Sequence, residues 1–88
     1  MVNKIKKLIK EKINIHYIDI FDRSGNHIDH KINSGGGHFK SIIVSNDFTD
    51  KSLIERHRMI YNALGEMMKN EIHAFSMKTL TINEYEKQ

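Results

Sequence analysis

The sequence predicts an α+β fold in which a three-stranded mixed sheet carries its helices on one face. Two segments repeat apolar residues at helical spacing, and three others alternate in polarity or are rich in β-branched and aromatic residues. They follow one another in the order α-β-β-α-β, with a further short helix expected at the C-terminus. With 88 residues, no internal repeat and no linker, the chain is expected to form a single domain spanning residues 1–88.

The first helix and the first strand lie at the N-terminal end. Val2, Ile5, Leu8 and Ile9 recur at helical spacing, and the lysines of this segment fall mostly on the other side. A helix packed on a sheet explains this pattern better than a membrane-surface helix, because so few apolar residues are available. The stretch "INIHYIDIF", residues 13–21, then predicts a strand.

A long connection separates this strand from the next. The stretch "HFKSIIVS", residues 38–45, predicts the second strand. Between the two lies "DRSGNHIDHKINSGGG", residues 22–37, which is polar, glycine-rich and too long for a tight hairpin. Loops of this length tend to be functional, so this segment is a candidate site region.

The main helix is predicted over residues 52–69. Ser52 and Glu55 form an S-x-x-E capping box, which satisfies two backbone N–H groups at the start of a helix. Asn70 is expected to end the helix.

The last elements are a third strand and a terminal helix. The stretch "EIHAFSMKTL", residues 71–80, alternates in polarity like a strand. The final stretch "INEYEKQ", residues 82–88, predicts a short helix.

An arginine–histidine–arginine run, residues 56–58, lies inside the main helix. At about 100° per residue, Arg56 lies at one edge of the apolar stripe and Arg58 points about 200° further round, into the polar sector. His57 falls within the stripe and is predicted to be a structural histidine with a hydrogen-bonded ring. Arg56 can hold a partner or a carboxylate, and Arg58 is expected to be solvated. The predicted stripe consists of Leu53, His57, Ile60, Tyr61, Leu64, Met67 and Met68.

Composition narrows the function classes. The chain has no cysteine, which excludes disulfides and any all-thiolate zinc or iron–sulfur site made by this chain alone. A net charge of +3, with five lysines in the first twelve residues, favours an anionic partner, although a solvated helix face is the ordinary alternative.

No apolar run is long enough to span a membrane. Because the start resembles neither a secretory signal nor a mitochondrial presequence, we expect a cytoplasmic protein, with the mitochondrion as the alternative.

Two stretches, "SGGGHFKSIIVSNDFTDKSLIERHRMIYNALGEMM" and "EIHAFSMKTLTINEYE", resemble the BolA-like protein family. The family pattern runs HFK, an apolar strand ending in VS, an F-x-G-K-S-type turn and RHR, then IHA, an alternating strand and T-x-x-E-W. Asp50 stands where the family usually has glycine, and Tyr85 replaces the usual tryptophan. The matching residues are His38, Phe39, Lys40, Val44, Ser45, Phe48, Lys51, Ser52, Arg56, His57, Arg58, Ile72, His73, Ala74, Thr81 and Glu84.

This resemblance implies an α-β-β-α-β arrangement similar to class II KH domains. KH domains that bind RNA clamp it with a G-x-x-G loop. This chain has no G-x-x-G, since residues 35–37 are followed by His38 and the other two glycines are isolated. The resemblance to KH domains is therefore one of topology, and it does not imply that this chain binds RNA as KH domains do.

The chain has six histidines and no cysteine, and neutral imidazole is a good ligand for iron and zinc. His27 and His30 resemble half a zinc site, but closed sites need about four donors. The resemblance implies more, because BolA-like proteins bind monothiol glutaredoxins and the pair can bridge a 2Fe-2S cluster. Glutaredoxin and glutathione then supply thiolates, so the isolated chain is expected to bind no cluster. By match to the family, the ligands here are His73 from the last strand and His27 from the loop, with His30 as the rival loop ligand.

The leading expectation is a non-enzymatic adaptor, monomeric alone and heterodimeric with a monothiol glutaredoxin, that serves iron–sulfur cluster assembly, trafficking or iron regulation. The alternative is a nucleic-acid-binding transcriptional regulator, a role also attributed to bacterial members of the family. In that case Lys51, Arg56, Arg58 and the basic first helix would contact phosphates. An enzyme is not expected, because no nucleophile lies in a recognisable catalytic context.

Overall fold

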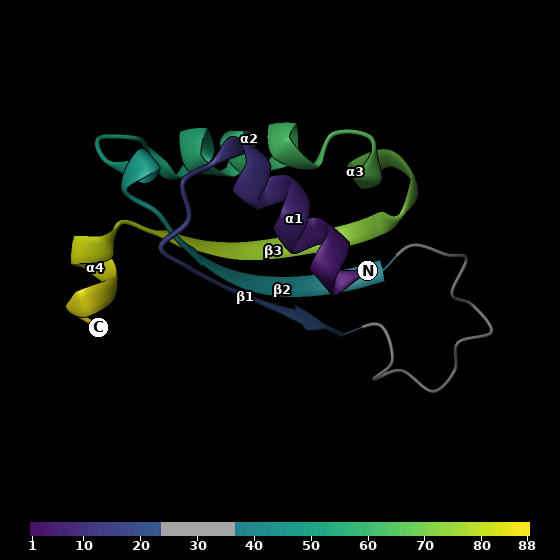
Figure 1. Ribbon diagram of the computed structural model, residues 1–88, viewed down its shortest axis with the longest axis horizontal. Coiled ribbons are helices and arrows are strands. Elements are labelled where there is room, and N and C mark those ends of the chain that lie inside the picture. Colours follow the sequence, from purple (N-terminus) through teal and green to yellow (C-terminus); the bar gives the residue numbers. More distant parts are fainter. Residues whose placement is uncertain (24–36) are drawn as a thin grey trace.

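A computed structural model describes residues 1–23 and 37–88 as a sheet with a layer of helices on one face (Figure 1). The strand order is β1-β2-β3, where β1 is Tyr17–Asp22, β2 is Gly37–Val44 and β3 is Ile72–Leu80. β1 pairs antiparallel with β2, and β2 pairs parallel with β3. The predicted α+β class and three-stranded mixed sheet are therefore confirmed.

The helices form one layer and one separate terminal element. α1, Val2–Lys12, and α2, Leu53–Leu64, pack side by side over one face of the sheet, and α3, Met67–Asn70, follows in the same layer (Figure 1). A 3₁₀ helix, Asn46–Phe48, precedes α2, and α4, Ile82–Glu86, lies at the opposite end of the sheet from α3. No helix in the described ranges is long and apolar enough to cross a membrane.

The core lies between the helical layer and the sheet. Side chains alternate along a strand, and the register pairs Ile20 with Ser41 and Phe39 with Phe75, so these four side chains point towards the helices. The core cluster contains Ile5, Ile9, Ile13, Ile20, Phe39, Ile43, Phe48, Ile60, Ala63, Leu64, Met67, Ile72 and Phe75.

α4 covers one end of the opposite face of the sheet. The Tyr85 ring stacks on Tyr17 with centroids 5.4 Å apart, and His16 meets the Tyr85 ring edge-on at 6.5 Å. Alternation along β2 turns Val44 away from the helices, so Val44 lies outside the main core cluster. Val44 is nevertheless fully buried. The predicted C-terminal helix is thus confirmed, and it serves as a cover for this end.

The first strand begins later than predicted. The Ile13 N–H donates to Ile9 O at 2.9 Å and closes α1, so residue 13 ends the helix instead of starting a strand. Ile13 is buried and Ile15 is partly buried against the core. The β-branched residues that predicted a strand here serve core packing between α1 and β1, and pairing starts at Tyr17.

The main helix is shorter than predicted. α2 ends at Leu64 because Gly65 adopts φ 56°, a conformation that other residues rarely adopt. The chain then forms the separate helix α3, whose last residue is Asn70. A single helix running to about Lys69 is therefore wrong, and the glycine inside the apolar pattern was the available signal.

α2 is also rotated relative to the predicted apolar stripe. Leu53 is 62% exposed and Tyr61 40% exposed, so their predicted burial is wrong. Arg56 is buried in their place, because the fold satisfies its charge internally, and a pattern that counts arginine as polar cannot find such a position. The buried residues of α2 are Arg56, Ile60, Ala63 and Leu64.

Candidate metal-binding and partner-binding sites

His38 and His73 lie side by side where β2 and β3 begin. Their ring centroids are 4.9 Å apart, with the ring planes at 38°. Parallel pairing brings the starts of both strands to the same edge of the sheet, and a register shift after the pair Gly37–Ile72 matches His38 with Ala74. His73 is exposed and His38 is half-buried, so the pair, which we call the histidine end, lies close to the surface.

Gly37 fixes the approach of the chain to His38. A Cβ atom at this position would lie 2.3 Å from Cε2 of Phe39, so only glycine lets the buried Phe39 ring pack beneath the strand start. The Gly37 N–H also donates to Glu71 O at 2.9 Å, which ties the start of β2 to the residue before β3. The two histidines are therefore held by the backbone pairing of their own strands.

The donor set at this end is small. No group of three or more histidine, cysteine, aspartate or glutamate side chains that could hold a metal occurs within residues 1–23 and 37–88. The predicted loop ligands His27 and His30 fall in residues 24–36, outside the described residues. A metal bound at His73 would therefore need donors from that segment or from another molecule. Sequence reasoning did not connect His38 with His73, although the parallel pairing of the strands that begin "HFK" and "IHA" would have done so.

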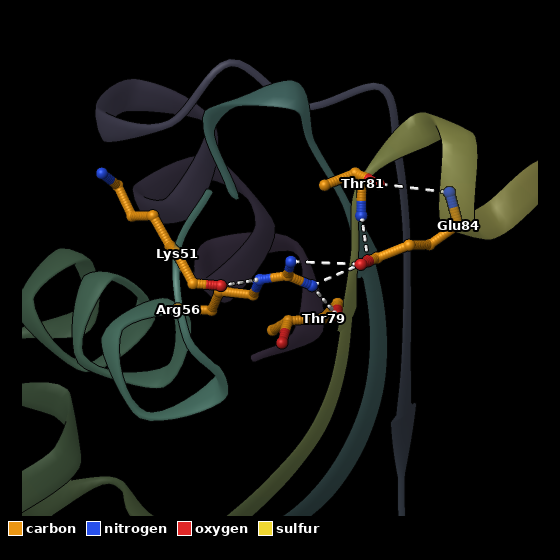
Figure 2. A network of polar contacts seen from close by, with 5 residues as sticks. All are labelled: Lys51, Arg56, Thr79, Thr81 and Glu84. Carbon is orange, nitrogen blue, oxygen red and sulfur yellow. Dashed lines mark hydrogen bonds and ion pairs between the residues drawn. The ribbon is translucent and has the colours of Figure 1, made fainter. Parts of the chain in front are cut away.

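A dense polar network lies at the other end of the sheet and connects α2, β3 and α4 (Figure 2). Arg56 donates from Nε to Lys51 O at 3.0 Å and from Nη1 to Thr79 O at 3.0 Å. Its two terminal nitrogens, Nη1 and Nη2, also donate to the Glu84 carboxylate at 2.8 and 3.2 Å. Thr81 completes the network, because its N–H donates to Glu84 Oε1 at 2.8 Å and its hydroxyl accepts from Glu84 N. We call these five residues the arginine end.

Electrostatics at the arginine end favour the ionised carboxylate. Hydrogen bonds from the Arg56 guanidinium, and then from the Thr81 backbone N–H, lower the pKa of Glu84 from 4.5 to about 2. Arg56 also lies over the Phe48 ring, with Cζ 5.9 Å from the ring centroid. Arg56 holds a carboxylate, which is one of the two roles predicted for it, and these internal bonds occupy its guanidinium.

The other members of the basic motif behave differently. Lys51 and Arg58 have exposed side chains, as expected for residues that contact another molecule. His57 is half-buried, and its ring makes no hydrogen bond within residues 1–23 and 37–88, so the predicted bond to the ring is not among the described contacts. The RHR run is thus divided between an internal arginine and an external one.

The net charge of the chain resides in the helical layer. Residues 1–12 and 46–71, which form this layer and the turns around it, carry nine of the 14 basic and six of the 11 acidic residues. The excess of basic over acidic residues in these two ranges equals the net charge of +3, so the remainder of the chain has no net charge. α1 contributes most, with five lysines and one glutamate, and lies beside α2 (Figure 1).

Residues 9–84 match the family model described as BolA-like protein. An uncharacterised protein of Buchnera aphidicola from Acyrthosiphon pisum is 40% identical over 84 residues, which are 96% of this chain and 79% of that protein. The DNA-binding transcriptional regulator BolA of Escherichia coli K12 is 34% identical over 87 residues, covering 93% and 80% of the two chains. The structure of BolA1 from Arabidopsis thaliana superposes with a TM-score of 0.81 at 27% identity, covering 96% of this chain and 94% of that one.

Proposed function

Because this chain belongs to the BolA-like protein family, we propose that it is a non-catalytic adaptor that docks a monothiol glutaredoxin and shares a 2Fe-2S cluster with it. The observation that carries the proposal is the pair of imidazoles, 4.9 Å apart, at the exposed edge where β2 and β3 begin. Imidazole is a good iron ligand, and a site with few donors suits a cluster completed by thiolates from the partner and glutathione.

The protein side of the shared site consists of histidines alone. His73 is the proposed strand ligand, and His27 is the proposed loop ligand with His30 as its rival. The geometry adds His38 as a third candidate, because its ring lies beside that of His73. Histidine ligands in place of thiolates raise the reduction potential of a 2Fe-2S cluster, so this chain would tune the shared cluster as well as bind it.

Reconstitution with a monothiol glutaredoxin, glutathione, iron and sulfide tests the proposal. The complex should give visible and circular-dichroism spectra distinct from those of glutaredoxin alone. His73→Ala should change the spectra, and His27→Ala, His30→Ala and His38→Ala identify the second ligand. His16→Ala is the matched control, because His16 is exposed and packs against Tyr85 at the opposite end of β1 from the histidine end. Unchanged spectra for every variant at positions 27, 30, 38 and 73 would exclude histidine ligation.

A second candidate function is nucleic-acid binding. The Escherichia coli relative is named a DNA-binding transcriptional regulator, and the positive helical layer of this chain suits a phosphate backbone. Arg56 is not proposed as a contact, because its guanidinium is bound internally. Duplex binding should weaken steeply with salt, and Lys51→Gln with Arg58→Gln should reduce the salt slope by about two. Absence of any binding at low salt would eliminate this function.

A further inference from the structure

α2 leaves a group of large hydrophobic side chains uncovered. Leu53 is 62% exposed, Ile54 64% and Tyr61 40%, and these are three of the six exposed large hydrophobic residues found in the described ranges. At 100° per residue the three lie within an arc of about 100° on one helix. We call them the α2 patch. A concentrated apolar patch of this kind marks a contact surface more strongly than isolated exposed residues do.

The patch is held rigidly at its start. Ser52 Oγ accepts from Glu55 N at 3.2 Å, and Ser52 N donates to Glu55 Oε1 at 2.7 Å, so the first turn of α2 is capped in both directions. Arg56 holds Lys51 O and links the same turn to Glu84 of α4. A surface that is already ordered loses little conformational entropy on binding.

The helical layer around the patch carries a net positive charge, although Asp50 and Glu55 are also exposed close to the patch. Lys51 precedes the patch along the chain, and Arg58 lies one turn after Ile54; both side chains are exposed. Glu55 lies on another side of the helix and is bonded to Ser52. The lysines of α1 lie in the same layer, which carries the whole net charge of +3 (Figure 1). A complementary surface would therefore be apolar at its centre and acidic around it.

We propose that the α2 patch is a docking surface for a folded protein that carries an apolar hollow bordered by carboxylates. The inference rests on the proposed function, because the docked protein is the thiol-bearing partner of the adaptor. The α2 patch supplies the protein–protein contact, and the histidine end supplies metal ligands. Docking through the patch therefore needs no cluster.

The chemistry of the patch disfavours two other occupants. A nucleic acid would present phosphates and bases to the patch. Neither group is complementary to two adjacent aliphatic side chains at the centre of the contact. A second copy of this chain would place one positive helical layer against another, because a two-fold interface joins the same surface on both molecules. A protein with an apolar hollow and an acidic surface matches both the apolar centre of the patch and the net positive charge of the helical layer.

Calorimetric titration of cluster-free monothiol glutaredoxin into the chain tests the inference. The double variant Leu53→Ser/Ile54→Ser keeps the charge and removes the apolar centre, and it should bind about 30-fold more weakly or worse. Asn62→Ser is the matched control on an exposed position of the same helix, and it should bind like the wild type.

The outcomes separate the two proposals. If the wild type fails to bind cluster-free glutaredoxin but forms the cluster-bound complex in the reconstitution, this inference alone is overturned. If the wild type fails in both experiments, the proposed function fails and this inference fails with it. If the wild type and the double variant bind equally, this inference alone is overturned. Both aliphatic side chains are exposed, so circular dichroism and thermal melting of the double variant should match the wild type, which shows that a loss of binding is not unfolding.

Two further measurements test whether the α2 patch binds a second copy of this chain or a nucleic acid instead. Sedimentation of the wild type and the double variant should show the same monomeric mass, and a dimer that the double variant loses would assign the patch to self-association. Duplex DNA binding should be equal for both proteins, because the substitutions leave the charge unchanged. A parallel loss of DNA binding would assign the patch to nucleic acid.

Discussion

Each end of the sheet carries side chains that the sequence marks as candidate binding residues, an arginine at one end and histidines at the other. The two ends nevertheless hold these side chains in different ways. At the arginine end, Arg56 is 7% exposed, and its guanidinium makes hydrogen bonds to two backbone carbonyls and one carboxylate (Figure 2). At the histidine end, an exposed imidazole and a half-buried one lie ring to ring, 4.9 Å apart. The first arrangement stabilises the position of α4 against α2 and β3, whereas the second leaves ligand atoms near the surface.

A basic or metal-binding residue type therefore does not identify a site until its hydrogen bonds are known. Arg56 and Arg58 are two residues apart in one motif, but Arg56 joins three elements internally and Arg58 points outward. We therefore expect substitutions at the arginine end to change stability first. Substitutions of the histidines should change binding first.

The largest effect on stability is expected for Arg56→Met. Arg56 is buried, whereas the Glu84 side chain is 45% exposed. The variant leaves the Glu84 carboxylate and the carbonyls of Lys51 and Thr79 without their common donor, and the loss of these hydrogen bonds costs about 3 kcal/mol. Urea denaturation followed by circular dichroism measures the change in the free energy of unfolding. Arg58→Met is the matched control and should stay within about 0.5 kcal/mol of the wild type. Equal losses for both variants would remove the distinction between the two arginines.

A smaller loss is expected for Gly37→Ala at the histidine end. The added Cβ would lie 2.3 Å from the ring of Phe39, which is buried and must move, so overpacking should cost about 2 kcal/mol. The same shift should alter the distance between His38 and His73, visible as changed nuclear Overhauser contacts between their rings. Gly65→Ala provides a comparison, because its Cβ is 4.0 Å from its nearest contact and the cost there comes from φ 56° alone. A Gly37→Ala variant as stable as the wild type would show that the strand start adapts freely.

Much of the fold could be predicted from local sequence patterns, because they act over neighbouring residues. The capping box at Ser52 and Glu55 needed only short-range rules. The rotation of α2 could not be predicted this way, because burial of Arg56 depends on Glu84, 28 residues away. The pairing of His38 with His73 likewise depends on which strands are parallel neighbours. The loop ligands His27 and His30 stay predictions.

Acidification should sharpen the contrast by acting on the arginine end. The pKa of Glu84 is about 2 in the folded chain and near 4.5 when unfolded, so its contribution is fully present above about pH 5. It is lost as the pH falls towards 2, because protonation removes the charge that the Arg56 guanidinium binds. The difference in unfolding free energy between the wild type and Glu84→Gln should therefore be constant near neutral pH, shrink as the pH falls below about 5, and be smallest below about pH 2. The pKa of Glu55 is also lowered, but this effect is common to both proteins and cancels. A pH-independent difference would show that the ion pair does not determine the effect.

The smallest effect, and one of opposite sign, is expected for Thr79→Val beside the same network. Thr79 is 2% exposed, and its Oγ1 has no hydrogen-bond partner in the described part of the chain, although its backbone carbonyl accepts from Arg56. Replacing a buried hydroxyl that lacks a partner by a methyl group of similar shape should leave stability unchanged or raise it by up to about 1 kcal/mol. Ser41→Ala is the matched control, because Ser41 is equally buried but its hydroxyl donates to Ser76 O at 3.1 Å, so it should lose about 1 kcal/mol. Thermal and urea unfolding of the pair would show opposite signs if hydrogen bonding, and not burial, decides which polar residues stabilise this fold. A loss for Thr79→Val as large as that for Ser41→Ala would mean that Oγ1 has a partner, and the arginine end would then extend one group further into the core.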